Sequence, residues 1–163
     1  MIILGIDPGL RFSGFGVLKK TQKQVLLLDY GLLKLSSTKN LQTRIHIFYD
    51  FFTEKIKKHN VTDIALETPF LGKNAQNFLK LGYLRGILHL LAAEHQTNLH
   101  EFSPRQVKLS VTGYGGASKE QVARMVLRLF PKMEQPKKDD VTDALAVTLC
   151  GLWHTKNSIP RHF

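Results

Sequence analysis

The sequence predicts an α/β fold built on one mixed central sheet, in which an antiparallel meander is followed by parallel strands flanked by helices. Two observations predict it: short apolar runs dominate the first 35 residues, and after them strand-like runs alternate with longer segments of helical periodicity. Strands joined by short turns pair antiparallel, whereas strands separated by a helix pair parallel. We expect one domain over residues 1–153 and a short polar tail over 154–163.

The opening segment has the pattern of a β-meander. Glycine, proline and polar residues divide it into apolar runs that are too short for helices. The predicted strands are Ile2–Asp7, Gly14–Lys19, Val25–Tyr30 and Leu32–Leu35, the last two joined through Gly31.

The remaining elements follow from apolar spacing and capping residues. Asn40 can cap a helix to about His59, whose apolar residues recur at spacings of three and four. Ser118 and Gln121 form a capping box, and Pro104 suits a first helical position. Further strands are predicted over Thr62–Glu67 and Asn98–Phe102, and further helices from Asn74 to about Glu94, from Ser103, from Ser118 to Phe130, and from Asp140 to about Trp153.

The helix predicted from Asn74 to Glu94 is apolar around more of its circumference than a one-sided helix requires. A second subunit could cover the additional apolar face, or the helix could be buried within one domain. The sequence leaves both possibilities open.

Composition favours a soluble protein with a polyanionic partner. Hydrophobic residues make up 43% and charged residues 22%, and no apolar run approaches the ~18 residues of a membrane span. The first apolar run stops at Asp7 with no basic region before it, so we expect no signal peptide. The single cysteine, Cys150, lies in an apolar stretch, which fits a buried thiol in a reducing cytoplasm. A net charge of +10 favours nucleic acid, because neither end offers a basic amphipathic anchor for a membrane.

Four acidic residues stand at positions that point to function. Asp7 and Glu67 each end an apolar strand. A proline follows Asp7 directly and follows Glu67 two positions later. Open sheets place their active sites at strand ends of this kind. Asp140 and Asp143 lie three residues apart in the first turn of the last helix, so they share a face. Glu67 could instead be an exposed edge carboxylate, and the aspartates could be ordinary first-turn acids.

If the four acids converge, they form an oxygen-rich ligand set. Mutual repulsion would raise some of their pKa values unless cations are bound, and oxygen ligands without Cys or His suit Mg²⁺ or Mn²⁺. Two such ions about 4 Å apart can activate a water and stabilise the leaving oxygen in phosphodiester hydrolysis. The seven histidines lack the spacing of a zinc site.

Several segments together resemble the RuvC family of Holliday junction resolvases, in order, from residue 2 to about 150. They are residues 3–9 with Gly14 and Gly16; Glu67 with Phe70 and Lys73-Asn74; Lys80-Leu81-Gly82 with Arg85-Gly86; residues 105–108; residues 113–119 with Gln121-Val122; and residues 140–146.

The resemblance implies an RNase H-like fold, a homodimer, and Mg²⁺-dependent cutting of two opposed strands of a four-way DNA junction in recombination and repair. It implies two Mg²⁺ ions per active site, replaceable by Mn²⁺, held by Asp7, Glu67, Asp140 and Asp143. It also implies a branch-migration motor of the RuvA/RuvB type as a partner.

The same resemblance implies roles outside the acids. Lys108 and Lys119 match basic residues near the scissile phosphate, where they would stabilise transition-state charge or assist proton transfer. Phe70 matches an aromatic that stacks on or wedges open bases, and Lys73 and Asn74 lie in the same DNA-contacting segment. Alternatively, the two lysines could belong to a surface that faces phosphates without a catalytic role, and Phe70 could be a core residue. Pro69, directly before Phe70, and the short segment after Trp153 depart from the family pattern.

Two other function classes fit part of the sequence. An actin-like or sugar-kinase-like ATPase lobe also begins with a strand that ends in Asp and Gly, but 163 residues leave no room for the second lobe that closes over nucleotide. A non-catalytic DNA architectural protein fits the basic charge and leaves the four acids unexplained.

Overall fold

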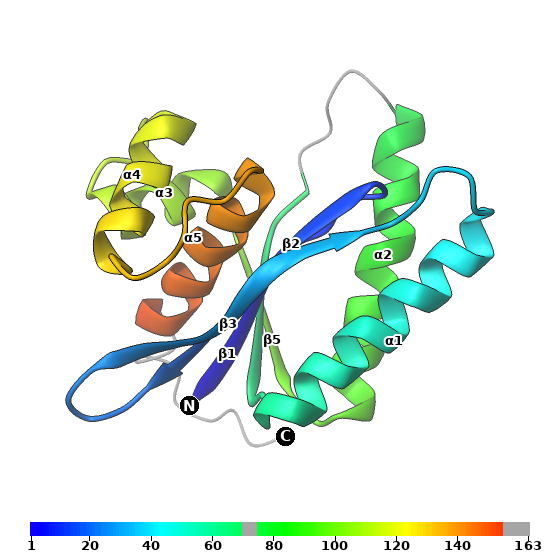
Figure 1. The fold of residues 1–163 in the computed structure, drawn as a ribbon, viewed down its shortest axis with the longest axis horizontal. Helices are drawn as coiled ribbons and strands as arrows, with labels where there is room; N and C mark the ends of the chain where they lie inside the picture. Colours follow the sequence, from blue (N-terminus) through cyan, green and yellow to red (C-terminus); the bar gives the residue numbers. More distant parts are fainter. Residues whose placement is uncertain (70–74, 155–163) are drawn as a thin grey trace.

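A computed structural model describes residues 1–69 and 75–154 of the chain (Figure 1). It contains one five-stranded sheet in the order β3-β2-β1-β4-β5. The strands are β1 (Ile2–Asp7), β2 (Phe12–Lys20), β3 (Val25–Lys34), β4 (Asp63–Glu67) and β5 (Asn98–Phe102). The helices are α1 (Leu41–His59), α2 (Ala75–Glu94), α3 (Pro104–Thr112), α4 (Lys119–Leu129) and α5 (Asp139–His154).

The sheet is mixed, as the sequence predicted. β2 pairs antiparallel with both β1 and β3, and these three strands form the meander. β4 pairs parallel with both β1 and β5, each time after a helical crossover. The central strand β1 therefore has one antiparallel and one parallel neighbour.

The expected break at Gly31 was wrong, because β3 continues through it to Lys34 as a single strand. Gly31 pairs with Phe15 of β2. A Cβ atom at Gly31 would lie 3.2 Å from Cε1 of the Phe15 ring, so the glycine makes room for that ring. Here glycine serves packing within a strand, a role that a local pattern does not distinguish from a turn.

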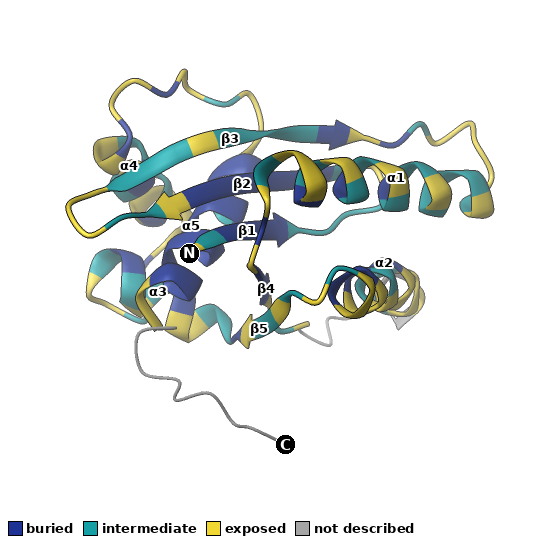
Figure 2. Ribbon diagram, turned by 90° about the horizontal axis from the view of Figure 1, so that it is seen from below, coloured by how far each residue is buried: buried dark blue, intermediate teal, exposed yellow. Residues whose placement is uncertain are grey.

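Helices cover both faces of the sheet. Figures 1 and 2 show α1 and α2 on one side and α5, flanked by α3 and α4, on the other. Phe48, Phe52 and Leu88 are fully buried on the first side. On the second side nearly all of α5 from Val141 to Leu152 is buried between the sheet and the two shorter helices. The sheet thus separates two apolar cores.

Capping residues fix where three helices begin. The Asn40 side chain accepts a hydrogen bond from Thr43 N at 2.9 Å, which confirms it as the N-cap of α1. The predicted capping box of Ser118 and Gln121 is present at α4. Ser103 forms a second capping box at α3, with Pro104 at the start of the helix. These caps satisfy backbone N–H groups that have no partner within the helix.

Packing against α1 and the sheet buries one face of α2, but not all of its apolar surface. Leu84, Leu88 and Leu91 are fully buried against the sheet side. Leu79 and Leu90 are 62% and 47% exposed. An apolar stripe therefore remains uncovered in the single chain.

Two further expectations concern membrane-spanning helices and the thiol. Across the described ranges, every helix is too short or too polar to cross a bilayer. Cys150 is a buried free thiol, as predicted, and burial raises its pKa.

Candidate active site

Asp7 and Glu67 lie side by side at one edge of the sheet. β1 and β4 are parallel neighbours, and the residues that precede the two acids, Ile6 and Leu66, are directly paired. The two strands therefore end together, and each ends in a carboxylate. The two acids therefore converge, as a shared site requires.

The N-terminus of α5 brings Asp140 and Asp143 to the same edge. Gly14, which pairs with Asp7 across β1 and β2, allows this approach. A Cβ atom on Gly14 would lie 1.8 Å from the backbone oxygen of Asp140, well inside van der Waals contact. The missing side chain at Gly14 thus lets the helix start directly above the sheet.

Three of the acids and both predicted lysines line one cavity. Its volume is about 240 Å³, and its walls include Asp7, Glu67, Asp143, Lys108 and Lys119. Asp140 is not among the lining residues, although its charge acts on both Asp7 and Asp143. The cavity is therefore an acidic site with two cations at its wall, and Asp140 stands at its margin.

Asp7 is the electrostatic centre of the group. Burial, together with the charges of Asp143, Asp140 and Glu67, raises the pKa of Asp7 from 3.8 to about 7, while Lys119 opposes the rise. Burial and like charges both disfavour an ionised carboxyl group. A cation placed among these acids would remove this penalty.

Lys119 partly neutralises the cavity. Its Nζ donates to Asp143 Oδ2 at 3.2 Å, and Asp143 raises the pKa of Lys119. Burial still raises the pKa of Asp143, although Lys119 lowers it. Desolvation and Asp143 raise the pKa of Glu67, whereas Lys119 and Lys108 lower it. Glu67 is exposed, so solvent weakens its interactions with these charges.

Asp7, Glu67 and Asp143 line the cavity without forming a closed ligand cluster. Over residues 1–69 and 75–154, no three Asp, Glu, His or Cys side chains lie close enough together to hold a metal ion. Repulsion between like charges and the Lys119–Asp143 ion pair both favour this open arrangement. The donor set consists of oxygens only, and the raised pKa of Asp7 marks negative charge that is incompletely compensated. Both features fit a hard divalent cation.

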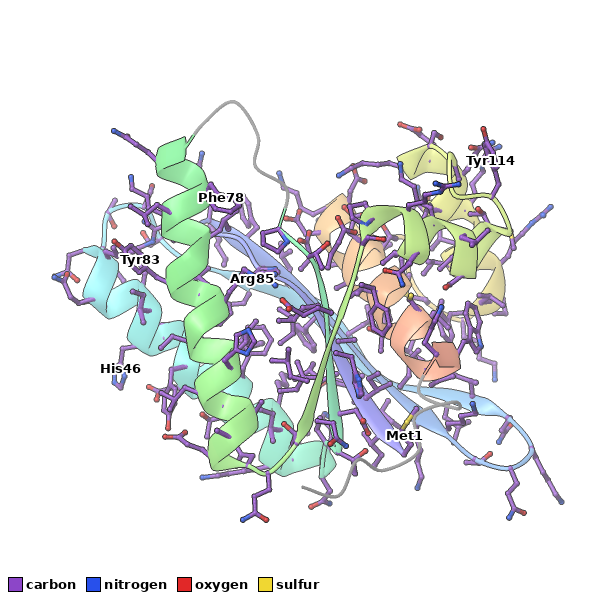
Figure 3. All side chains as sticks on the ribbon, turned by 180° about the vertical axis from the view of Figure 1, so that it is seen from behind. Met1, His46, Phe78, Tyr83, Arg85 and Tyr114 are labelled. Atoms are coloured by element: carbon purple, nitrogen blue, oxygen red, sulfur yellow. The ribbon has the colours of Figure 1, made fainter. Side chains whose placement is uncertain are left out.

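Arg85 holds the end of β4 from the helix side. Its Nη1 donates to the backbone oxygen of Glu67 at 2.7 Å, and its Nη2 pairs with the Glu101 carboxylate of β5. Figure 3 shows Arg85 extending from α2 toward the strands. Thr68 N also donates to Phe102 O at 2.8 Å. The backbone that carries Glu67 is therefore fixed by both α2 and β5.

The sequence did not indicate that Arg85 holds the backbone of Glu67, because Arg85 was noted only as part of the segments that resemble the RuvC family. The bond to Glu67 joins residues 18 positions apart, and no local periodicity reports it. The predicted DNA contacts Phe70, Lys73 and Asn74 lie outside the described residues.

Comparison with known proteins gives the family. The family model for crossover junction endodeoxyribonuclease RuvC matches residues 3–151. The RuvC of Legionella pneumophila is 37% identical over 160 residues, which cover 98% of this chain and 91% of that protein. The chain belongs to the RuvC family.

Solved RuvC structures agree with the fold. The RuvC structure from Thermus thermophilus matches with a TM-score of 0.85 and 28% identity, covering 96% of each chain. The same protein in complex with a Holliday junction substrate matches with a TM-score of 0.85 and 25% identity, again over 96% of each chain. The RNase H-like fold expected from the sequence is thereby confirmed.

Family membership answers the choice among function classes. RuvC proteins are crossover junction endodeoxyribonucleases and depend on metal, so this chain is a nuclease rather than an ATPase lobe or a non-catalytic architectural protein. The comparison therefore confirms the enzyme class predicted from the sequence, a metal-dependent phosphodiester hydrolase.

Replacing Gly14 with alanine should damage the site and the fold together. The added methyl group would press on the backbone of Asp140 and push the start of α5 away from β2. We expect Gly14→Ala to destabilise the protein by about 1–3 kcal/mol, as overpacking does. At a temperature where the variant is still folded, junction cleavage should fall at least about tenfold. Circular dichroism melting and a cleavage assay check this; unchanged cleavage would show that the close approach does not position the acids.

Proposed function

We propose that this protein resolves four-way DNA junctions by metal-dependent hydrolysis of one phosphodiester bond in each of two opposed strands, in recombination and repair. The observation that carries the proposal is the cavity at the end of the central strand, where Asp7 meets Glu67, Asp143 and Lys119, with Asp140 close enough for its charge to act on Asp7. The family match and the junction complex of the Thermus thermophilus relative support a four-way junction as the substrate.

The four carboxylates would hold the metal. We assign Asp7, Glu67, Asp140 and Asp143 as ligands of Mg²⁺, two ions per site, with Mn²⁺ as a substitute; the oxygen-only donor set supports this choice. The metal, when bound, supplies the charge that stabilises an in-line phosphoryl displacement and lowers the pKa of the attacking water. Asp7 would contribute most, because it interacts with all three other acids.

The lysines would act on the phosphate. Lys119 and Lys108 line the acidic cavity from α4 and α3. An ammonium group beside the scissile phosphate stabilises the charge that develops on its oxygens. Binding of a cation among the acids would free Lys119 from its ion pair with Asp143, so that its Nζ could turn to the phosphate.

Phe70, Lys73 and Asn74 complete the proposed DNA contact. They lie between the end of β4 and the start of α2, directly after the strand that carries Glu67. Their position in sequence supports contact with bases near the junction point, with Phe70 stacking on or separating them.

Cleaving two opposed strands calls for two active sites, and we propose a homodimer formed through α2. Leu79, Tyr83, Gly86 and Leu90 recur at spacings of four, three and four, and all four are exposed. Figure 3 shows Tyr83 on the side of α2 away from the strands. A glycine within an apolar stripe permits close approach of a second helix.

The dimer proposal predicts that Leu90→Glu gives a monomer, because a charge would be buried in the contact without a partner. Light scattering measures the molar mass of the wild type and the variant. Gln42→Glu, which adds the same charge on exposed α1, should remain a dimer. A wild-type monomer would contradict the dimer, and a dimeric Leu90→Glu variant would contradict the α2 interface.

The resemblance also leads us to propose a branch-migration motor of the RuvA/RuvB type as a partner and the cytoplasm as the site of action.

The catalytic proposal is tested with the purified protein and does not require the motor. Four-way junctions labelled on one strand at a time are incubated with Mg²⁺, across a set of sequences, with linear duplex as the control. We expect paired nicks in opposed strands of the junction and no cutting of the duplex. Binding without cutting over the whole set would refute the proposal.

Arg85 should act as a positioning residue for Glu67. Arg85→Gln removes the hydrogen bond to the Glu67 carbonyl and the ion pair to Glu101 together. We expect cleavage to fall by about 10–100-fold, as for groups that orient metal ligands, with a higher Mg²⁺ concentration for half-maximal rate. Junction affinity measured without metal should not change, and Arg85→Lys should recover part of the loss.

Glu101→Gln is the matched control for Arg85, since it removes the ion pair and leaves the bond to Glu67 in place. Glu101→Gln should raise the Mg²⁺ concentration for half-maximal rate less than Arg85→Gln does. A normal Mg²⁺ titration for Arg85→Gln would show that Arg85 only stabilises the fold.

A further inference from the structure

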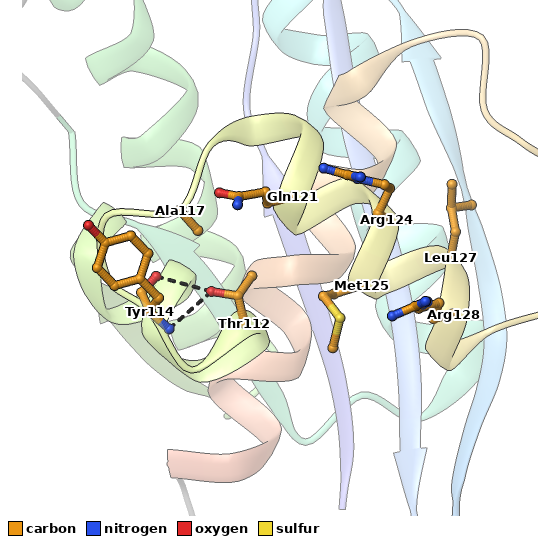
Figure 4. Close-up of a pocket in the computed structure, with 8 residues that line it drawn as sticks. All are labelled: Thr112, Tyr114, Ala117, Gln121, Arg124, Met125, Leu127 and Arg128. Carbon is orange, nitrogen blue, oxygen red and sulfur yellow. Dashed lines mark hydrogen bonds between the residues drawn. The ribbon is translucent and has the colours of Figure 1, made fainter.

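A second cavity lies against a different face of α4. Its volume is about 410 Å³, and Tyr114, Gln121, Arg124, Met125 and Arg128 contribute to its walls (Figure 4). α4 therefore presents Lys119 and Val122 to the acidic cavity and its two arginines to this one. The metal site and the second cavity share one short helix as a wall.

Tyr114 is held in an exposed position by its own loop. The Tyr114 side chain is 66% exposed, while its backbone N donates to Thr112 Oγ1 at 3.1 Å. Its carbonyl accepts from Ala117 N at 3.2 Å. The ring rests over Gly116, where a Cβ atom would lie 2.6 Å from the tyrosine Oη. The backbone is thus tethered and the ring is left facing solvent, an arrangement that suits a contact with a ligand better than a contribution to the core.

The cavity is cationic. Arg124 and Arg128 are exposed, and neither forms a salt bridge with a residue in the described part of the chain. Arg124 Nε contacts the backbone oxygen of Glu120 at 3.4 Å, and no acidic side chain lines the cavity. Guanidinium groups with free donors match phosphate oxygens, and an exposed aromatic ring stacks on bases or sugars.

The cavity lies on the side of the molecule where DNA would be cut. In Figure 3, Tyr114 is at the upper end of the molecule, the end toward which β4 runs and near which Phe78 of α2 lies. The carboxyl ends of β1 and β4, with Asp7 and Glu67, face the same end. A strand whose phosphate reached the acidic cavity could continue across α4 to Tyr114.

We propose that Tyr114, Arg124 and Arg128 form a second DNA contact, which binds the sugar-phosphate backbone of a junction arm beyond the cut site. The arginines bind phosphates, and the tyrosine ring packs on a nucleotide. This inference rests on the proposed function and adds to it a site that orients the arm rather than one that carries out chemistry.

The test measures junction affinity by fluorescence anisotropy in EDTA at several salt concentrations. Losing two phosphate contacts should lower the slope of log affinity against log salt by about 2 for Arg124→Ala with Arg128→Ala. Tyr114→Ala should weaken binding by about tenfold with little change in slope, and Tyr114→Phe should bind normally. Single-turnover cleavage at saturating protein should stay within about threefold of wild type for each variant, since none of these residues lines the acidic cavity.

The charge-matched control is Lys57→Ala with Lys58→Ala, two exposed cations in the last turn of α1. Melting curves confirm that each variant is folded. A slope change in the arginine variant no greater than in this lysine control would overturn the proposal, as would normal affinity of Tyr114→Ala. Either result leaves the proposed function intact, because that function fails only if the wild type does not cut junctions.

Discussion

Asp7→Asn should abolish junction cleavage while leaving junction binding close to that of the wild type. The amide is nearly the same size as the carboxyl group and removes one negative charge from the centre of the four acids. We expect the cleavage rate to fall by about 10³-fold or more, as it does when a central catalytic group is removed. DNA contacts made by lysines and arginines do not depend on this carboxylate, so affinity should persist.

The measurement is single-turnover cleavage of a labelled four-way junction, together with binding in EDTA. Asp50→Asn is the matched control, because it makes the same chemical change at an exposed carboxylate of α1. The control should cleave normally. Cleavage by Asp7→Asn at the wild-type rate would remove Asp7 from the proposed metal site.

The second large effect is on stability without metal. The pKa of Asp7 is about 7 in the folded protein and near 3.8 when unfolded, so between these values the folded state holds a proton that the unfolded state has released. Stability must then fall as pH rises from about 4 to 7, and it stays low above that range. Asp7→Asn removes this penalty, so metal-free Asp7→Asn should be more stable than the wild type at pH 8, by roughly 2–4 kcal/mol at most.

Urea unfolding in EDTA at pH 5 and pH 8 tests this, with the difference between wild type and Asp7→Asn as the measured quantity. That difference reports on Asp7 together with the neighbouring acids whose charges interact with it, and carboxyl groups elsewhere in the chain cancel. Asp29 and Asp63, whose pKa values are lowered by hydrogen bonds, titrate below this window. Mg²⁺ should stabilise the wild type more at pH 8 than at pH 5, and Asp7→Asn little at either pH. An equal difference at both pH values would contradict a raised pKa at Asp7.

Much of the fold follows from local signals in the sequence. The central strand, the caps at Asn40 and Ser118 and the buried last helix are all present, because each depends on neighbouring residues or on periodicity. The expected break at Gly31 failed for the opposite reason. That glycine accommodates Phe15 on a paired strand, and the chain around it does not show this contact.

The residues of the candidate site also differ in whether local sequence or tertiary packing reveals them. Asp7 and Glu67 could be found because a charge at the end of an apolar strand is anomalous by itself. The interaction of Arg85 with Glu67 and the approach of Gly14 to Asp140 depend on how distant elements pack, so no spacing rule predicts them. Tyr114 belongs to this second group, since its value as a contact comes from arginines on a separate helix.

The most direct test of the central claim is to locate the metal. Crystals of the wild-type protein soaked in Mn²⁺ would be measured at the manganese absorption edge, and Asp7→Asn crystals would serve as the control. The account predicts anomalous density between Asp7, Glu67 and the start of α5 in the wild type, with Asp7 contacting each ion, and its loss in the variant. Manganese bound elsewhere on the protein, with none in this cavity, would contradict the assignment of the four acids.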